Sequence, residues 1–395
     1  MAASLTGREP ALTSISDDRW VAGASAYSSE KRLPPIFLDM LLAHKAAAAR
    51  ANRSLGALPE AVADAIVQQA QALRVANPRD PGPSIWQSGC GLEFNRWANV
   101  RIAEACTLHG SASVTPAQVN CNQSTNDTIP TVLQLALLRA YTAELAPASE
   151  LLQTRLRSGV ERMASHRIMG RTFLRDAKWM PLADVLAGWA DLIQAHQDWL
   201  AAASRELAWI PQGGYSLGNG DGIDPRFADA YVTSLHAAEG IACRPSASPS
   251  TEIAGIRAIS AFAGALVTLC AGIEKVAADM LLLCSGPVYG FGDLAFEETA
   301  NDSTTLAGKS NPKPVTTVLM ACAYAKAQGS LATDLAARGQ LALFTGFPLV
   351  AYALLDAVYV LAHQLRAFAN DFVVQLQPQR TAPLPTGAGN DNAEH

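Results

Sequence analysis

Charged residues are scarce in this sequence of 395 residues: they make up 16% of it, against 49% hydrophobic residues, and the mean hydropathy is +0.11. A chain with so few charges must bury much of its surface, in a large core or against other subunits. The formal net charge is −5 and the isoelectric point is about 5.8. The sequence has no basic tract of the kind that follows phosphates, so we expect no nucleic-acid partner.

Paired cysteines and membrane-length apolar runs are also missing. The most apolar stretch, 347–361, contains Pro348 and Asp356 and is predicted to be a buried helix, so we expect no membrane span. The N-terminus lacks a basic region followed by an apolar core, so we expect no secretory signal. No histidine pattern fits a metal site, and we expect neither metal nor cofactor. Free thiols in the cytoplasm are expected, because the cysteines occur singly, at 90, 106, 121, 243, 270, 284 and 322.

Helical periodicity fills most of the chain, without a convincing succession of strands or a repeat. An all-α fold is therefore predicted, with a mostly helical N-terminal domain at 1–118, a long-helix bundle at 119–376 and a disordered tail at 377–395. Helices of about 25 to 35 residues are roughly 40 to 50 Å long and need partners on several sides, which favours bundles that assemble with one another. The predicted helices are one that begins at 33–35 and ends before 55, then 60–75, one from near 94, 131–156, 181–209, 227–239, 251–284, 314–337 and 347–375.

Two polar segments precede predicted helices. In the first, WQSGCG at 86–91, two glycines flank Cys90; such a turn either holds an anion with backbone amides or is a tight turn and no more. The second contains Ser124, Thr125 and Asn126, all good N-cap residues. One cap requires one such residue, whereas several donors at the positive end of a helix suit a carboxylate.

A third polar segment, 301–312, lies between two apolar helical stretches. Gly308 permits a turn, and Asn311-Pro312 disfavours helix at Asn311 and can start the next helix. The loop carries a nucleophile or base, Ser303, together with a fixed cation, Lys309. Composition alone favours an ordinary surface loop, because loops of this kind are common.

Four motifs in a fixed order change that balance: WQSGCG, VNCNQSTND, GRTFLRDA and the SxxxxxKxNP pattern from Ser303 to Pro312. Together they resemble the class II fumarase/aspartase superfamily of homotetrameric lyases, over roughly residues 35 to 375. The resemblance implies a small N-terminal domain, a long central bundle and twenty helices at the tetramer core. The family's small C-terminal domain has no counterpart in this sequence, so we expect it to be absent.

The resemblance also implies chemistry: anti β-elimination of a C–N or C–O bond from a succinyl-type or related carboxylate, through an aci-carboxylate, with release of fumarate or an analogue. No cofactor is implied, and each site draws on three subunits. Ser303 falls on the family's base, with Lys309 as the cation that holds a carboxylate. The substrate-binding positions are Ser124, Thr125, Asn126, Thr172, Asn311, Cys90, Leu92, Asn95 and Phe173.

Several positions depart from the family pattern. Phe173 stands where the family has His, and Thr316 stands where it has the Glu that partners that His. Cys90 and Leu92 replace Ser and Thr, and Asp302 replaces a Gly beside the base, where a carboxylate opposes ionisation of the serine.

Three alternatives follow from these departures. The first is a lyase whose substrate has one ordinary carboxylate and a more apolar second end. The second is an enzyme like the carboxymuconate cycloisomerases. The third is a catalytically degenerate homologue that serves as a scaffold or partner subunit.

Overall fold

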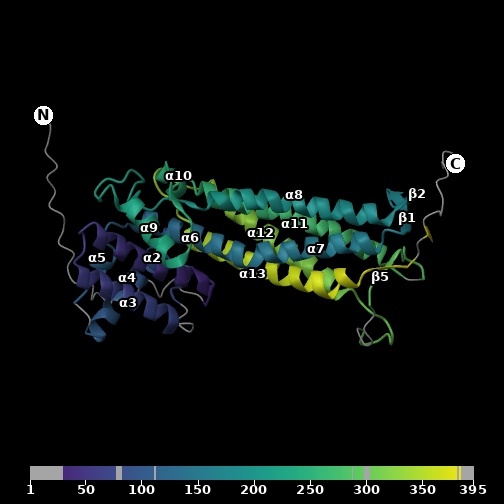
Figure 1. Cartoon of the computed structure of the whole chain (residues 1–395), viewed down its shortest axis with the longest axis horizontal. Coiled ribbons are helices and arrows are strands. Elements are labelled where there is room, and N and C mark those ends of the chain that lie inside the picture. The colour runs from purple at the N-terminus through teal and green to yellow at the C-terminus, as the bar shows by residue number, and fades with distance from the viewer. Residues whose placement is uncertain are drawn as a thin grey trace.

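The computed structural model describes residues 30–76, 82–110, 113–286, 288–297 and 303–379, and the backbone of 382–383. Long helices run side by side along the molecule (Figure 1), and each packs on the next in a closed ring from α7 through α8, α11, α12 and α13 back to α7. Continuous helix leads into α7 through α6 and the π-helical turn η1. The bounds are α6 Thr125–Ala140, η1 Tyr141–Leu145, α7 Ala146–Arg162, α8 Leu182–Glu206, α11 Arg257–Leu283, α12 Lys313–Ala336 and α13 Phe347–Asp371.

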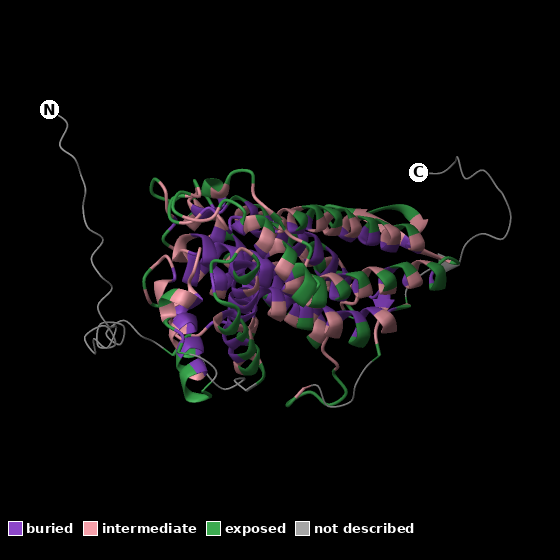
Figure 2. Ribbon diagram, turned by 60° about the vertical axis from the view of Figure 1, so that its left-hand side comes forward, coloured by how far each residue is buried: buried purple, intermediate pink, exposed green. Residues whose placement is uncertain are grey.

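The N-terminal helices gather at one end of this bundle, at the left of Figure 1. Helix α2 is the link between the two parts, because Phe37 and Leu41 join the core of the bundle whereas Leu42 and Ala46 join a second, smaller core with α3 and α4. The burial colours of Figure 2 show the buried residues concentrated where these helices meet the bundle. The bounds are α2 Pro35–Ser54, α3 Glu60–Ala76, α4 Leu92–Leu108, α5 Pro116–Val119, α9 Phe227–Glu239 and α10 Pro249–Ile253.

The all-α prediction is confirmed, and most helices lie where periodicity predicts them, but two predicted helices differ: that expected at 131–156, which continues through η1 and α7 to Arg162, and that expected at 251–284. Helix α6 begins at Thr125 instead of 131, because Ser124 caps it and Pro130 is accommodated within it. The helix expected at 251–284 is two helices, because Ile256, at φ 41°, interrupts the helical conformation between α10 and α11. There the buried Glu252 carboxylate accepts hydrogen bonds from Ala258 N at 3.0 Å and Arg257 Nε at 2.8 Å, and so caps α11.

An antiparallel hairpin, β1 (His166–Thr172) with β2 (Arg175–Pro181), is the main element that the sequence did not predict. Its two-residue turn holds Phe173 at φ 51° and Leu174 at φ 59°, a conformation that sequences usually mark with Asn-Gly. Because Phe-Leu carries no such mark, the turn escaped detection. The remaining strands are short: β3 Trp209–Ile210 with β4 Arg244–Pro245, β5 Leu294–Ala295 with β6 Gln377–Pro378, and β7 Ala382–Pro383 against β1.

The strands β6 and β7 fall within the tail expected to be disordered, and backbone pairing with β5 and β1 orders them. The rest of that tail, 380–381 and 384–395, lies outside the described residues, as do residues 1–29.

Helix α13 and the 3-10 turn η2 (Val373–Gln375) form the one segment in the described part of the chain with the length and hydropathy of a membrane span. Of its most apolar window, 61% is buried inside the bundle. Packing against α7 and α12 therefore accounts for its composition, as in the core helix of a bundle.

Candidate functional site

The turn around Cys90 is fixed by close backbone packing at the start of α4. A Cβ on Gly89 would lie 2.4 Å from the carbonyl oxygen of Thr345, and Gly91 adopts φ 79° against Ile129. Only glycine fits both positions. Cys90 Sγ lies 3.2 Å from Ser88 Oγ, and Leu92, the first helical residue, is half-buried. This turn presents a thiol and an apolar side chain at the positive end of a helix.

The polar cluster at 124–126 begins α6. Ser124 Oγ accepts from Asn126 N at 3.3 Å, while Asp127 accepts from Ser124 N at 2.9 Å, so the cap is reciprocal. Asn95 Nδ2 donates to Thr125 Oγ1 at 3.0 Å and thereby joins α4, the helix that follows the first motif, to the second motif. Asn126 Nδ2 donates to the carbonyl of Ser216 at 2.8 Å. The structure brings Cys90, Leu92, Asn95 and the 124–126 cluster to the same end of the molecule.

Asp127 anchors this cluster to the glycine-rich connector around 211–220. It is fully buried, and its second oxygen accepts from Gln212 Nε2, Gly213 N and Tyr215 N at 3.0 to 3.1 Å. Burial raises the pKa of Asp127 to about 6, against the opposing effect of these backbone N–H groups and of Lys45. Asp127 was not among the predicted site residues, and the sequence did not reveal either of its two roles.

A buried polar layer beneath the cluster was also missed. Lys45 Nζ donates to Asn120 Oδ1 at 3.0 Å and to Gln123 Oε1 at 2.9 Å, and His44 Nε2 lies 3.0 Å from the same Gln123 oxygen. His44 Nδ1 lies 2.7 Å from Tyr231 OH. His44 and Lys45 lie on the Ala-rich helix α2. Their sequence context resembles that of a solvent-exposed helix, and the packing of α2 between other helices buries them.

The tip of the β1–β2 hairpin carries Thr172 and Phe173. Thr172 is exposed, and Phe173 is 99% exposed in spite of its size. Bulky residues at positive φ store strain of about 1 to 2 kcal/mol each. Close to the turn, Arg171 holds the hairpin through an ion pair to Asp293 at 2.5 Å and a stacking contact on Phe291 with 4.5 Å to the ring centroid.

The Ser303 loop lies at the same end of the bundle as the hairpin. Ser303 Oγ accepts from Leu306 N at 2.9 Å and from Thr305 N at 3.3 Å, an arrangement that favours negative charge on that oxygen. Lys309 is exposed, Asn311 is half-buried and Gly308 adopts φ 77°. Asp302 lies outside the described residues.

The predicted site residues thus form two groups at opposite ends of the bundle. Cys90, Leu92, Asn95 and the 124–126 cluster lie where α11 begins, and Thr172, Phe173 and the Ser303 loop lie where it ends (Figure 1). Helix α11 has 27 residues and is therefore about 40 Å long. Within the described part of one chain, the two groups do not meet.

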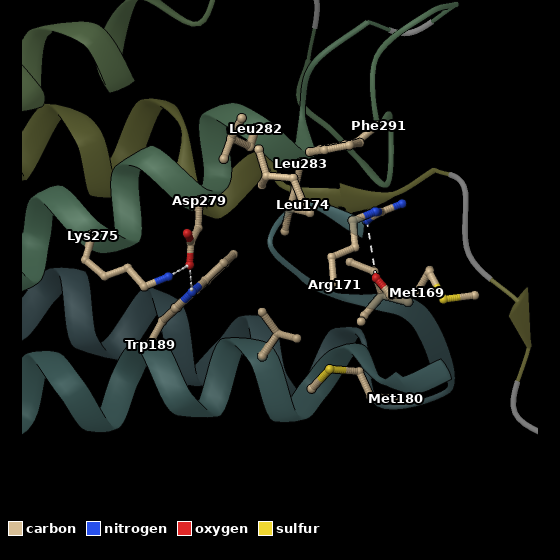
Figure 3. A pocket seen from close by; sticks show the side chains of 13 residues that line it. Met169, Arg171, Leu174, Met180, Trp189, Lys275, Asp279, Leu282, Leu283 and Phe291 are labelled. Carbon is tan, nitrogen blue, oxygen red and sulfur yellow. Dashed lines mark hydrogen bonds and ion pairs between the residues drawn. The ribbon is translucent and has the colours of Figure 1, made fainter. Parts of the chain in front are cut away.

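A pocket of about 200 Å³ lies under the hairpin, between the ends of α8 and α11. Its walls are mostly apolar, and Leu174 and Met180 close one side (Figure 3). The polar groups in it are already engaged: Lys275 and Trp189 Nε1 both bind Asp279. None of the predicted site residues, all of which lie in the described part of the chain, lines this pocket, although Arg171 and Leu174, which do, are the chain neighbours of Thr172 and Phe173.

Comparisons with known proteins give consistent results. The family described as "Lyase" matches residues 6–326. The class II fumarate hydratase of Methylorubrum extorquens is 30% identical over 88% of this chain and 75% of its own length, and that of Chromobacterium violaceum is 31% identical over 89% and 78%. In structure, the class II fumarase of Schistosoma mansoni superposes with a TM-score of 0.86 at 24% identity, covering 91% of this chain and 80% of that one. A fumarate lyase:delta crystallin of Brucella melitensis, bound to cobalt, gives 0.86 at 25% identity with the same coverage.

Proposed function

This chain belongs to the fumarase/aspartase superfamily of lyases, and from that premise we propose that it catalyses anti β-elimination from a small carboxylate substrate. The leaving group is bound through nitrogen or oxygen. The observation that carries the proposal is the pair of backbone N–H groups on Ser303 Oγ, at 2.9 and 3.3 Å, in the loop that also presents Lys309. A serine must ionise to act as a base, and those donors stabilise its oxyanion.

In the proposed reaction, the Ser303 oxyanion removes the proton from the carbon next to a carboxylate. The electron pair of the broken C–H bond moves into that carboxylate and forms an aci-carboxylate dianion. Lys309, Asn311 and the donors at the start of α6 hold the dianion. The electron pair then returns to form the carbon–carbon double bond, and the C–N or C–O bond on the adjacent carbon breaks with its electrons leaving on the departing atom.

The active assembly that we propose is a homotetramer whose sites each combine parts of three subunits. The supporting observation is the separation of about 40 Å between the two groups of site residues in one chain. Exposed apolar side chains at the loop end support it too: Phe173 is 99% exposed and Leu306 is 58% exposed. Copies packed side by side in opposite directions would bring the Ser303 loop of one against the 124–126 cluster of another. The assembly is proposed to act in the cytoplasm.

The substrate that we propose has one ordinary carboxylate and an apolar or uncharged second end. Leu92 offers no hydroxyl, and Phe173 offers no acid or base where the family has His. The Thr316 hydroxyl donates to the carbonyl of Lys313 at 2.9 Å, so its hydrogen bond is made within its own helix. These positions favour a substituted succinate, an amino acid derivative or a lactone of the cycloisomerase type over malate.

The alternative function is that of a scaffold or partner subunit without catalysis. The same replacements at Leu92, Phe173 and Thr316 support it, because each removes a polar group from the site. The retention of Ser303 with its two N–H donors supports the lyase, since a scaffold has no use for a stabilised oxyanion.

A screen of succinyl-type and lactone substrates for formation of a conjugated product separates these functions. We expect turnover by the unmodified chain and at least a hundredfold loss in Ser303→Ala, since the base is lost. Thr305→Val is the matched control, because it removes a hydroxyl from the same loop while the Thr305 N–H remains. Undiminished turnover in Ser303→Ala would exclude it as the base. Silence across the panel, without any ligand-induced thermal shift, would favour the scaffold.

A further inference from the structure

A lysine is buried completely on α2. Lys45 is 0% exposed, whereas the side chains of Lys275 and Lys326 are 57% and 34% exposed. Burial of an ammonium group costs several kcal/mol unless polar groups compensate it. Those groups are the amide oxygens of Asn120 and Gln123, at 3.0 and 2.9 Å from Nζ. Within the described residues, Lys45 makes no ion pair. Its position therefore calls for a reason other than stability.

The hydrogen bonds of Lys45 lead to the carboxylate-binding end of the molecule. Asn120 Oδ1, which accepts from Lys45, also accepts from Asn95 Nδ2 at 3.2 Å, and Asn95 Nδ2 in turn donates to Thr125 Oγ1 at 3.0 Å. Asn120 and Gln123 belong to the loop that directly precedes Ser124. Lys45 thus holds this loop from below and is connected to Thr125 through two asparagine side chains.

We propose that Lys45 is a positioning residue whose ammonium group fixes loop 119–123 and, through Asn120 and Asn95, orients Thr125 and the donors at the start of α6 toward a carboxylate. The inference rests on the proposed function for the chemistry of the ligand. The ammonium also places a positive charge behind the positive end of α6, and the two add in attracting an anion.

The charge state of Lys45 makes this role dependent on pH. Burial lowers the pKa of Lys45 to about 7, with Asp127 acting in the opposite direction. The titratable groups around it are His44 on its own helix, Asp127 on α6, Tyr231 on α9 and Cys121 in the loop. Burial raises the pKa of the Tyr231 hydroxyl and the Cys121 thiol, so both stay neutral near pH 7. The α4 side chains on this side are the neutral amides of Asn95 and Asn99.

His44 stays neutral in the same range, since burial lowers its pKa. The Gln123 side-chain oxygen can only accept, so Nε2 of His44 carries the proton and Nδ1 accepts from the Tyr231 hydroxyl. The pKa of Asp127 is about 6, below that of Lys45. Above pH 7, Lys45 is therefore the group whose charge changes. As pH rises through about 7, its ammonium becomes an amine, and both the hold on the loop and the positive charge weaken.

Succinate, an unreactive dicarboxylate, serves as the probe. Its dissociation constant is measured by calorimetry from pH 6 to 9 on the full chain and on Lys45→Met, together with hydrogen exchange of peptides covering 119–126, corrected for intrinsic rates. We expect the affinity of the unmodified chain to fall roughly tenfold as pH rises, because charged hydrogen bonds from the ammonium are replaced by weaker neutral ones. The Lys45→Met variant should bind roughly tenfold more weakly at pH 6, with little further change once Asp127 is ionised and with faster exchange.

Lys275→Met is the matched control, an identical change on α11 that should keep both the affinity and its pH dependence. Asn120→Asp keeps the acceptor but adds a carboxylate beside Nζ, which raises the pKa of Lys45 and moves the fall in affinity and protection to higher pH. That variant decides the question even where Lys45→Met fails to fold, because an unmoved midpoint overturns the proposal.

The two ideas fail in different ways. Succinate binding that Lys45→Met leaves unchanged in strength and pH profile overturns the role of Lys45 and leaves the carboxylate site intact. Absence of binding at every pH by both succinate and butyrate, a monocarboxylate with an apolar second end, counts against the proposed site, and hydrogen exchange then decides the positioning role. Protection of 119–126 that depends on pH in the unmodified chain alone supports the role, and equal protection in both proteins overturns it.

Discussion

The two ends of the bundle are built in different ways. At the end that carries Asn95 and Thr125, polar side chains are buried and hydrogen-bonded to one another, and Asp127 and Lys45 are both fully enclosed. At the other end, Phe173 and Lys309 are exposed, and within the described residues the Ser303 hydroxyl accepts hydrogen bonds from two backbone N–H groups of its own loop. One end is organised by buried hydrogen bonds, whereas the other presents Lys309 and Phe173 outward. This difference supports the proposal that each chain carries two complementary halves of a site.

The largest effect that this comparison predicts is complementation between inactive variants. Ser303→Ala damages the loop end and Asn126→Ala damages the cluster end, so each variant alone should lose activity. When the two are dissociated, mixed and reassembled, roughly one site in four should combine two intact halves, because the halves come from different subunits of a symmetric oligomer. The measurement is the activity of the mixture on the panel of succinyl-type and lactone substrates, with light scattering to follow assembly.

The control for complementation is a mixture of Ser303→Ala with Lys309→Ala. Both changes fall in the same loop. Every chain of a mixed oligomer therefore has a damaged loop, and no activity should return. Recovery in this control, or no recovery in the first mixture, would contradict a site divided between the two ends. A stable monomer in light scattering at micromolar concentration would do the same.

The next effect concerns stability at the buried end. Asp127→Ala removes the acceptor of four N–H groups, those of Ser124, Gln212, Gly213 and Tyr215. Buried donors left without an acceptor cost about 1 to 3 kcal/mol each, so we expect the free energy of unfolding to fall by about 3 kcal/mol or more. Denaturant unfolding followed by circular dichroism measures the change.

Asp224→Ala provides the comparison for that loss. Asp224 also accepts several hydrogen bonds, from Arg226 N, Nε and Nη2, but its partner Arg226 is 70% exposed. A surface ion pair contributes about 1 kcal/mol at most, so this variant should unfold nearly as the unmodified chain does. Equal losses in the two variants would show that Asp127 does not anchor the connector.

Much of this architecture was accessible from the sequence, for identifiable physical reasons. Apolar periodicity persists over the long helices, and α9 was predicted with its bounds at Phe227–Glu239. Four motifs in a fixed order predicted the family and the all-α fold. The comparisons with known proteins confirm both. The roles of Ser303 and Lys309 stay predictions. The hairpin was missed because Phe173-Leu174 occupies a turn that normally requires Asn-Gly. Lys45 was missed because its burial arises from tertiary packing around an Ala-rich helix, and no local pattern reports it.

The smallest effect lies at the strained hairpin tip. Phe173→Gly and Leu174→Gly each remove a bulky side chain from a residue with positive φ and so relieve its strain. Each should stabilise the hairpin by about 1 kcal/mol, seen as slower hydrogen exchange of 166–181. Their effects on substrate preference should differ, because Leu174 lines the pocket under the hairpin whereas Phe173 projects from its tip. Loss of an aromatic contact costs about 0.5 to 1.5 kcal/mol. Phe173→Gly should therefore lower the preference for apolar substituents by roughly two- to tenfold, whereas Leu174→Gly should preserve it. A parallel loss in both variants would assign the effect to the turn backbone, and no loss in either would remove Phe173 from the substrate's surroundings.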